Sequence, residues 1–158
     1  MHRLKWLNSL NKVSLFLAGS VLLFMLFLTV FNTLSTFLGY PVKGAFELLG
    51  FCGAILSGLA LGPTQAQDGH IRVTLLDGFW GKGTGKFLQA LSLLLALVFF
   101  AVLGIKLLEL ARSLYEFEEL SQTLNIIFYP FVLIVGVGVF LLVLNLGAQF
   151  LICLRGKE

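Results

Sequence analysis

Charged residues are scarce in this sequence. They make up 12% of its 158 residues, whereas a typical soluble domain carries about 25%. Hydrophobic residues reach 58%, and a chain of this length has too little interior to hide so much apolar surface from water. The composition therefore excludes an ordinary soluble globule, a disordered chain and a disulfide-stapled secreted scaffold. It predicts a protein of the lipid bilayer.

Histidine and cysteine are scarce as well, with two of each. His2 and His70 lie in separate segments, and no HExxH motif provides a metal site. Cys52 and Cys153 do not form a CxxC pair. The glycine-rich stretch 78–86 lacks the spacing of a phosphate-binding loop. We therefore expect no metal, no cofactor and no enzymatic activity.

Long stretches without any charge divide the chain. These four runs lie between Lys12 and Lys43, between Glu47 and Asp68, between Lys86 and Lys106, and between Glu119 and Arg155. A helix needs about 20 mostly apolar residues to cross a bilayer, and the runs are continuously apolar, unlike the alternating strands of a membrane barrel. The pattern predicts an all-α integral membrane protein that forms one domain over residues 1–158. Its four expected transmembrane helices cover residues 13–38, 45–66, 87–106 and 126–153.

The basic residues predict the orientation of the chain. The eleven Lys and Arg residues give a net charge of +3, but they form no cluster interleaved with aromatic residues, so we expect no nucleic-acid partner. Eight of them lie before residue 13, between the second and third spans, or after the fourth span, and the other three, Lys43, Lys106 and Arg112, lie on the opposite side. Because cytoplasmic loops carry an excess of Lys and Arg, we predict that both termini face the cytoplasm.

The segment 2–12 has an amphipathic pattern. Leu4, Leu7 and Leu10 recur every three residues, with Trp6 and basic residues around them. Such a segment can lie in the membrane interface on the cytoplasmic side. An ordinary charged start to the first span accounts for the same residues, and the sequence leaves both interpretations open.

The third helix is expected to continue beyond its apolar run. Lys106, Glu109 and Arg112 follow each other at spacings of three, which allows them to pair along a helix. We predict that this helix continues out of the membrane or along its outer surface. A solvated continuation and a partner-binding face both remain open.

Small and polar residues within the spans indicate helix packing. The second span has a small residue at every fourth position: Gly50, Ala54, Gly58 and Gly62. Such a row lets helix backbones approach closely, and polar side chains can form hydrogen bonds across helices. The polar candidates are Asn145 and Gln149 in the fourth span, and Thr29, Asn32, Thr33 and Thr36 in the first. We favour packing within the chain over a partner interface for these residues.

Three segments carry a resemblance to a known family. The second span begins with the acidic residue Glu47 and is followed by Asp68-Gly69-His70-Ile71-Arg72-Val73. The stretch 121–124, Ser-Gln-Thr-Leu, leads into the span that contains Pro130. Together with the length, the span count and the orientation, these segments resemble the small membrane subunit (DctQ-like, or Q subunit) of tripartite ATP-independent periplasmic (TRAP) transporters. The resemblance covers residues 13–154.

This resemblance implies a transporter subunit in the bacterial inner membrane. In that family a large membrane subunit carries the substrate, often an organic acid, together with sodium, and a periplasmic binding protein delivers the substrate. The small permease subunit is thought to brace the large one during ion-gradient-driven import. Glu47, His70 and Arg72 are then candidates for the partner interface or for organising loops. Alternatively, they are charged anchors at the bilayer edges.

Two other classes of membrane protein fit the sequence less well. An autonomous homo-oligomeric carrier of the small multidrug kind needs an acidic residue deep in its first span, and none lies between Lys12 and Lys43. A thiol-oxidising membrane enzyme needs reactive cysteine pairs in loops. We expect Cys52 and Cys153 near opposite ends of their helices, too far apart to form a disulfide.

Overall fold

The structure, a computed structural model, describes residues 2–67 and 82–154. This part of the chain forms four α-helices: α1 (His2–Phe37), α2 (Ala45–Ala66), α3 (Lys82–Glu116) and α4 (Tyr129–Leu154). Each is long and apolar enough to cross a membrane. The prediction of an all-α membrane protein with four spanning helices is therefore confirmed.

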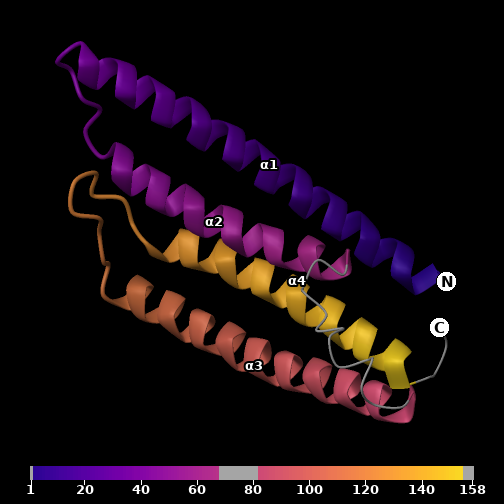
Figure 1. Ribbon diagram of the computed structural model, residues 1–158. Helices are drawn as coiled ribbons and strands as arrows, with labels where there is room; N and C mark the ends of the chain where they lie inside the picture. Colours follow the sequence, from indigo (N-terminus) through magenta and orange to yellow (C-terminus); the bar gives the residue numbers. More distant parts are fainter. Residues whose placement is uncertain (1, 68–81, 155–158) are drawn as a thin grey trace.

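The helices form a row in the order α1, α2, α4, α3 (Figure 1). α2 packs between α1 and α4, α4 packs between α2 and α3, and α1 contacts α4 only marginally. The start of α1 and the end of α4 lie at one end of the row, which we call the terminal end (Figure 1). The connections 38–44 and 117–128 lie at the opposite end, the loop end.

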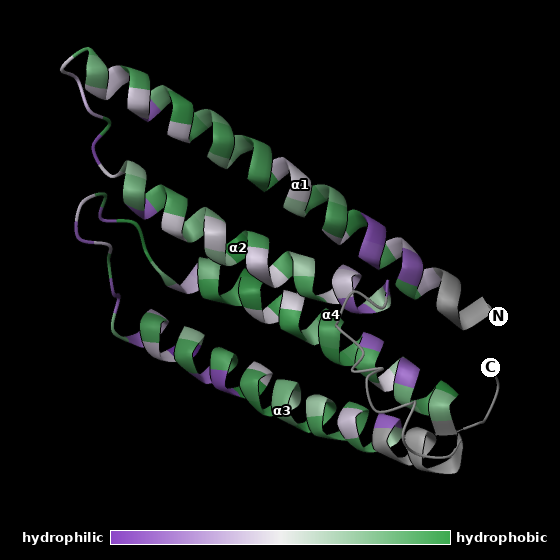
Figure 2. Cartoon of the chain, viewed as in Figure 1, coloured by the Kyte–Doolittle hydropathy of each residue, from purple (hydrophilic) through white to green (hydrophobic). Residues whose placement is uncertain are grey.

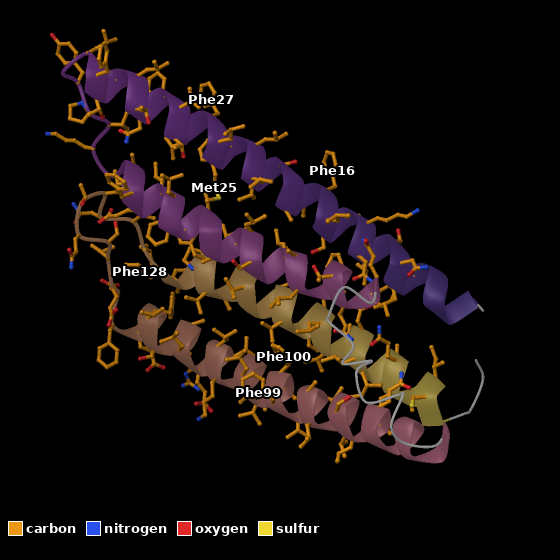
Figure 3. All side chains as sticks on the ribbon, in the orientation of Figure 1. Phe16, Met25, Phe27, Phe99, Phe100 and Phe128 are labelled. Carbon is orange, nitrogen blue, oxygen red and sulfur yellow. The ribbon has the colours of Figure 1, made fainter. Side chains whose placement is uncertain are left out.

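The row leaves large apolar surfaces uncovered. Hydrophobic residues occupy most of the length of every helix (Figure 2). Phe16 and Phe27 point away from α1 and are 76% and 67% exposed (Figure 3), and Phe99 of α3 is 63% exposed. Soluble monomers rarely expose such continuous apolar surface. These faces are suited to contact with lipid tails or with another membrane protein.

The buried core lies along α4. Leu142, Leu146 and Val139 are at most 2% exposed and are among the most buried large side chains of the described residues. Towards the loop end, Phe51 of α2 stacks on Phe131 of α4 with ring centroids 4.3 Å apart. α4 holds the core because it is covered by α2 on one side and by α3 on the other.

α1 and α3 are longer than their predicted spans. α1 is one continuous helix of 36 residues, about 54 Å long at 1.5 Å per residue. Residues 2–12 are therefore its first three turns, as an ordinary charged start predicts, and not a separate surface segment. Within this stretch, Asn11 is bound to α4 by hydrogen bonds.

The continuation of α3 is present in the structure, and the helix ends at Glu116 instead of at residue 106. Its exposed turns carry two ion pairs, Lys106 with Glu109 at 2.6 Å and Arg112 with Glu116 at 2.8 Å. Arg112 thus pairs with Glu116, one turn later, and not with Glu109. Such exposed pairs contribute little to stability, about 0.3–0.5 kcal/mol each.

Candidate functional site

Glu47 connects the start of α2 to the loop that precedes α4. One carboxylate oxygen, Oε1, accepts a hydrogen bond from the backbone N–H of Thr123 at 2.8 Å. The other, Oε2, accepts bonds from the Ser121 hydroxyl at 3.0 Å and from the Leu124 N–H at 3.1 Å. A single side chain in the first turn of α2 therefore satisfies three donors of a loop 74 to 77 residues further along the chain.

The loop that Glu47 binds is compact. The Ser121 side chain, in a residue only 2% exposed, also accepts a hydrogen bond from the Ile126 N–H at 3.2 Å. The Ser121 N–H donates to the Ile126 carbonyl at 2.9 Å, and Leu120 and Ile127 form an isolated antiparallel bridge. α4 consequently begins at Tyr129 and not at the predicted residue 126.

Gly44 allows this loop to approach α2. It has a positive φ of 75°, a left-handed conformation that glycine adopts without strain. A Cβ at this position would also overlap the side chain of Leu124. Both the conformation and the contact therefore require glycine at the N-cap of α2.

The predicted small-residue row of α2 is divided between two environments. Gly58 and Gly62 pack against α4, where they contact Val135 and Leu141. Gly50 and Ala54 are exposed, and a Cβ added at Gly50 would meet no atom of another segment within 4 Å. α4 therefore covers only the terminal-end half of the row.

The closest approach of α2 and α4 involves a glycine that sequence reasoning missed. A Cβ on Gly138 would overlap the backbone carbonyl group of Gly58. The signal was present as three glycines in the fourth apolar run, Gly136, Gly138 and Gly147. The sequence did not reveal which of them faces α2, because all three are compatible with a membrane helix.

Two pairs of amide side chains tie the helices together at the terminal end. Asn11 of α1 and Asn145 of α4 exchange hydrogen bonds of 2.9 and 3.0 Å, and both residues are at most 6% exposed. Gln65 of α2 donates to the Gln149 side-chain oxygen at 2.6 Å, and Gln149 donates to the Gln65 backbone carbonyl at 2.9 Å. Asn145 and Gln149 were candidates from the sequence, whereas Asn11 and Gln65 were not.

Pro63 creates a third polar contact in this region. Proline has no N–H, so the carbonyl four residues earlier, that of Leu59, lacks its helical donor. The Ser14 hydroxyl of α1 donates to this carbonyl at 2.6 Å. α2 continues past Pro63 to Ala66, so the proline does not end the helix.

The polar face of the first span makes no contact of this kind. The hydroxyls of Thr29, Thr33 and Thr36 donate to carbonyls four residues earlier in α1, at 2.7–2.8 Å. Asn32 accepts a hydrogen bond from the Val42 N–H at 3.1 Å, which fastens the connection after α1. The expectation that these residues pack against another helix of the chain was therefore wrong, because α1 is at the edge of the row and exposes this face; a partner interface stays a prediction.

The described residues contain no group of three His, Cys, Asp or Glu side chains that could hold a metal ion. Cys52 and Cys153 are free thiols. His70 and Arg72, the other two charged candidates, lie outside the described residues. Within residues 2–67 and 82–154, the candidate site residues pack helices against each other or form hydrogen bonds that hold loops in place.

A comparison with protein families decides the identity of the chain. Residues 25–156 match the model described as "Tripartite ATP-independent periplasmic transporters, DctQ component". The chain belongs to the DctQ family. A comparison with curated proteins finds no match.

As a DctQ-family member, the chain is the small membrane subunit of a TRAP transporter and not an enzyme. It is a multi-pass inner-membrane protein, in agreement with its four spanning helices. The family match includes Glu47 and its loop but begins at residue 25, so Asn11 and Ser14 precede it. Two segments that carried the resemblance, Glu47 and 121–124, bind each other directly.

Replacing Glu47 with Gln is expected to loosen the 117–128 loop of this DctQ-family chain. Gln keeps the size of the side chain but has only one acceptor oxygen, so the Thr123 or the Leu124 N–H loses its partner. We expect amide exchange at the N–H that is left unpaired to become at least about tenfold faster. Hydrogen exchange followed by mass spectrometry in detergent measures the effect.

The matched control is Glu109→Gln, because Glu109 is an exposed carboxylate that pairs with Lys106 on its own helix. This control should leave exchange in the loop unchanged. Equal exchange rates in Glu47→Gln and the unmodified protein would show that Glu47 does not organise the loop.

Proposed function

We propose that this chain is the static small permease subunit of a sodium-coupled importer, and that it braces the large membrane subunit that carries the substrate. The proposed substrate class is an organic acid, delivered by a periplasmic binding protein. The observation that carries the bracing role is the row of four helices with uncovered apolar faces (Figure 1).

The distribution of polar groups supports a role without substrate handling. The amide pairs Asn11–Asn145 and Gln65–Gln149 are engaged with each other between helices. An open groove between α2 and α4 is lined mainly by apolar side chains. A pathway for an anionic solute and cations requires polar or ionisable groups that face it, and we assign those groups to the large subunit.

The helix contacts support a rigid layer. The glycine contact between Gly58 and Gly138 fixes α2 against α4, and the Ser14–Leu59 bond fixes α1 against α2. A layer that keeps its shape can support a partner that changes conformation.

The proposed orientation places the terminal end in the cytoplasm and the loop end in the periplasm. It rests on the sequence, in which eight of the eleven Lys and Arg residues precede the first span, lie between the second and third spans, or follow the fourth. In this orientation Glu47 shapes a periplasmic loop, close to where a periplasmic binding protein approaches. His70 and Arg72 follow α2 in sequence at the cytoplasmic end, where we propose that they contact the partner or organise the connection to α3.

Reconstitution in liposomes tests the proposal. We expect sodium-gradient-driven uptake of an organic acid only when this chain, the large subunit and the binding protein are all present. The chain alone should give no uptake above that of empty liposomes. Uptake by the chain alone, which the autonomous-carrier alternative predicts, would contradict the proposal, as would full uptake by the other two components without it.

A further inference from the structure

An open groove lies between the loop-end halves of α2 and α4. It has a volume of about 390 Å³. Gly50 and Ala54 line it on the α2 side, and Phe128, Phe131 and Val135 line it on the α4 side. Phe128 lies at the loop end of α4 (Figure 3). We call this feature the α2–α4 groove.

The groove continues an existing helix–helix interface. Gly50 and Ala54 belong to the same four-residue row as Gly58 and Gly62, which already pack against α4. Small residues at this spacing allow the backbone of another helix to approach closely. Half of the row is therefore occupied by a helix of the chain itself, and the other half is open.

The exposed side of α2 also differs from the exposed sides of the outer helices. α1 and α3 expose large apolar side chains, for example Leu23 at 68% and Leu95 at 62%. The exposed residues of α2 beyond its first turn are small: Gly50, Ala54, Ser57, Thr64 and Ala66. Faces rich in large apolar residues are suited to lipid tails, whereas small residues favour a packed helix. The contrast favours a helix over an acyl chain as the occupant.

The surface of the groove is apolar. Glu47 is the only charged residue among those that line it, and its carboxylate binds the 121–124 loop. The ion pairs within the described part of the chain are Lys106–Glu109 and Arg112–Glu116, so no described basic side chain neutralises Glu47. A helix with Lys or Arg at the level of Glu47 and apolar residues below it complements the groove in charge and in polarity.

We propose that the α2–α4 groove receives one transmembrane helix of the large membrane subunit. This assignment rests on the proposed function. A large apolar side chain of that helix fills the space beside Gly50 and Ala54, and a basic side chain at its loop end pairs with Glu47. The uncovered faces of α1 and α3 are then the faces that contact lipid.

Site-specific photo-crosslinking tests the assignment in the full chain coexpressed with its large subunit. The photoreactive residue p-benzoylphenylalanine is placed at Ala54 in one variant and, for comparison, at Leu23 of α1 or Leu95 of α3, which are also exposed. We expect a covalent adduct with the large subunit from position 54 and not from positions 23 or 95. An adduct between two copies of this chain from position 54 would overturn the assignment in favour of a homodimer.

The experiment separates the groove from the proposed function. If position 23 or 95 captures the large subunit and position 54 captures only lipid, the complex exists but the groove assignment is wrong. If no position captures the large subunit and the two chains do not copurify, the proposed function fails as well.

A matched pair of glycine variants gives a second test. Gly50 and Gly19 are both exposed helical glycines with open space at the position of a Cβ. Gly50→Leu fills the groove and should reduce copurification of the large subunit about tenfold or more, the effect of about 1.4 kcal/mol of binding energy. Gly19→Leu, on α1, should leave it unchanged. Equal copurification of the two variants would overturn the assignment.

Discussion

The substitution Gly138→Ala is expected to destabilise the protein strongly, although alanine is the better helix former. A Cβ at Gly138 would overlap the backbone carbonyl group of Gly58 on α2. Backbone atoms cannot rotate away as a side chain can, so α2 and α4 must separate. Overpacking in tight interiors costs about 1–3 kcal/mol, and we expect a value at the upper end of this range.

Gly136→Ala is the matched control. It lies two residues away on the same helix, and a Cβ there meets no atom of another segment within 4 Å. Replacing a helical Gly by Ala contributes about 0.5–1 kcal/mol in favour of the helix, so this variant should be as stable as the unmodified protein or more stable. The free energy of unfolding in mixed detergent micelles measures both changes. If the two variants show the same stability, α2 and α4 do not meet at Gly138.

The second large effect is expected at the pair Asn11–Asn145. Asn145→Leu removes one partner of a reciprocal amide contact in which both residues are buried. The Asn11 amide is then left without its partner, which costs about 1–3 kcal/mol. We expect the same loss for Asn11→Leu, measured as the free energy of unfolding in the same micelles.

The double variant distinguishes a specific pair from two independent effects. With both amides replaced by Leu, no buried polar group is left unpaired, so stability should return to within about 1 kcal/mol of the unmodified protein. Strictly additive losses in the double variant would contradict the pairing. They would show that each amide contributes through its own surroundings.

The sequence indicates several residues of the site, but it does not indicate which of them contact each other. Glu47 was a candidate from its place at the start of the second span, and Ser121 lies in a stretch that resembles the family. Their direct contact joins segments 74 residues apart, and no local pattern predicts such a pairing. Ser14 was not a candidate, since its role depends on a carbonyl that Pro63 leaves free in another helix.

The sequence by itself determined that the chain forms four membrane-spanning helices. In lipid every backbone polar group must be satisfied within the protein, so each long uncharged run has essentially one available structure, the helix. It also predicted that α3 continues past its apolar run with charge pairs along it, because the i, i+3 and i, i+4 spacings are local.

Only the tertiary structure decided the order of the row and the division of the small residues of α2 between α4 and an open groove. The physical reason is that lipid tails are as apolar as leucine, so burial alone does not select which helix faces meet. That selection depends on close fit, such as Gly58 against Gly138, and on amide pairs such as Asn11 with Asn145. These residues lie far apart in the chain and come together only when the helices pack.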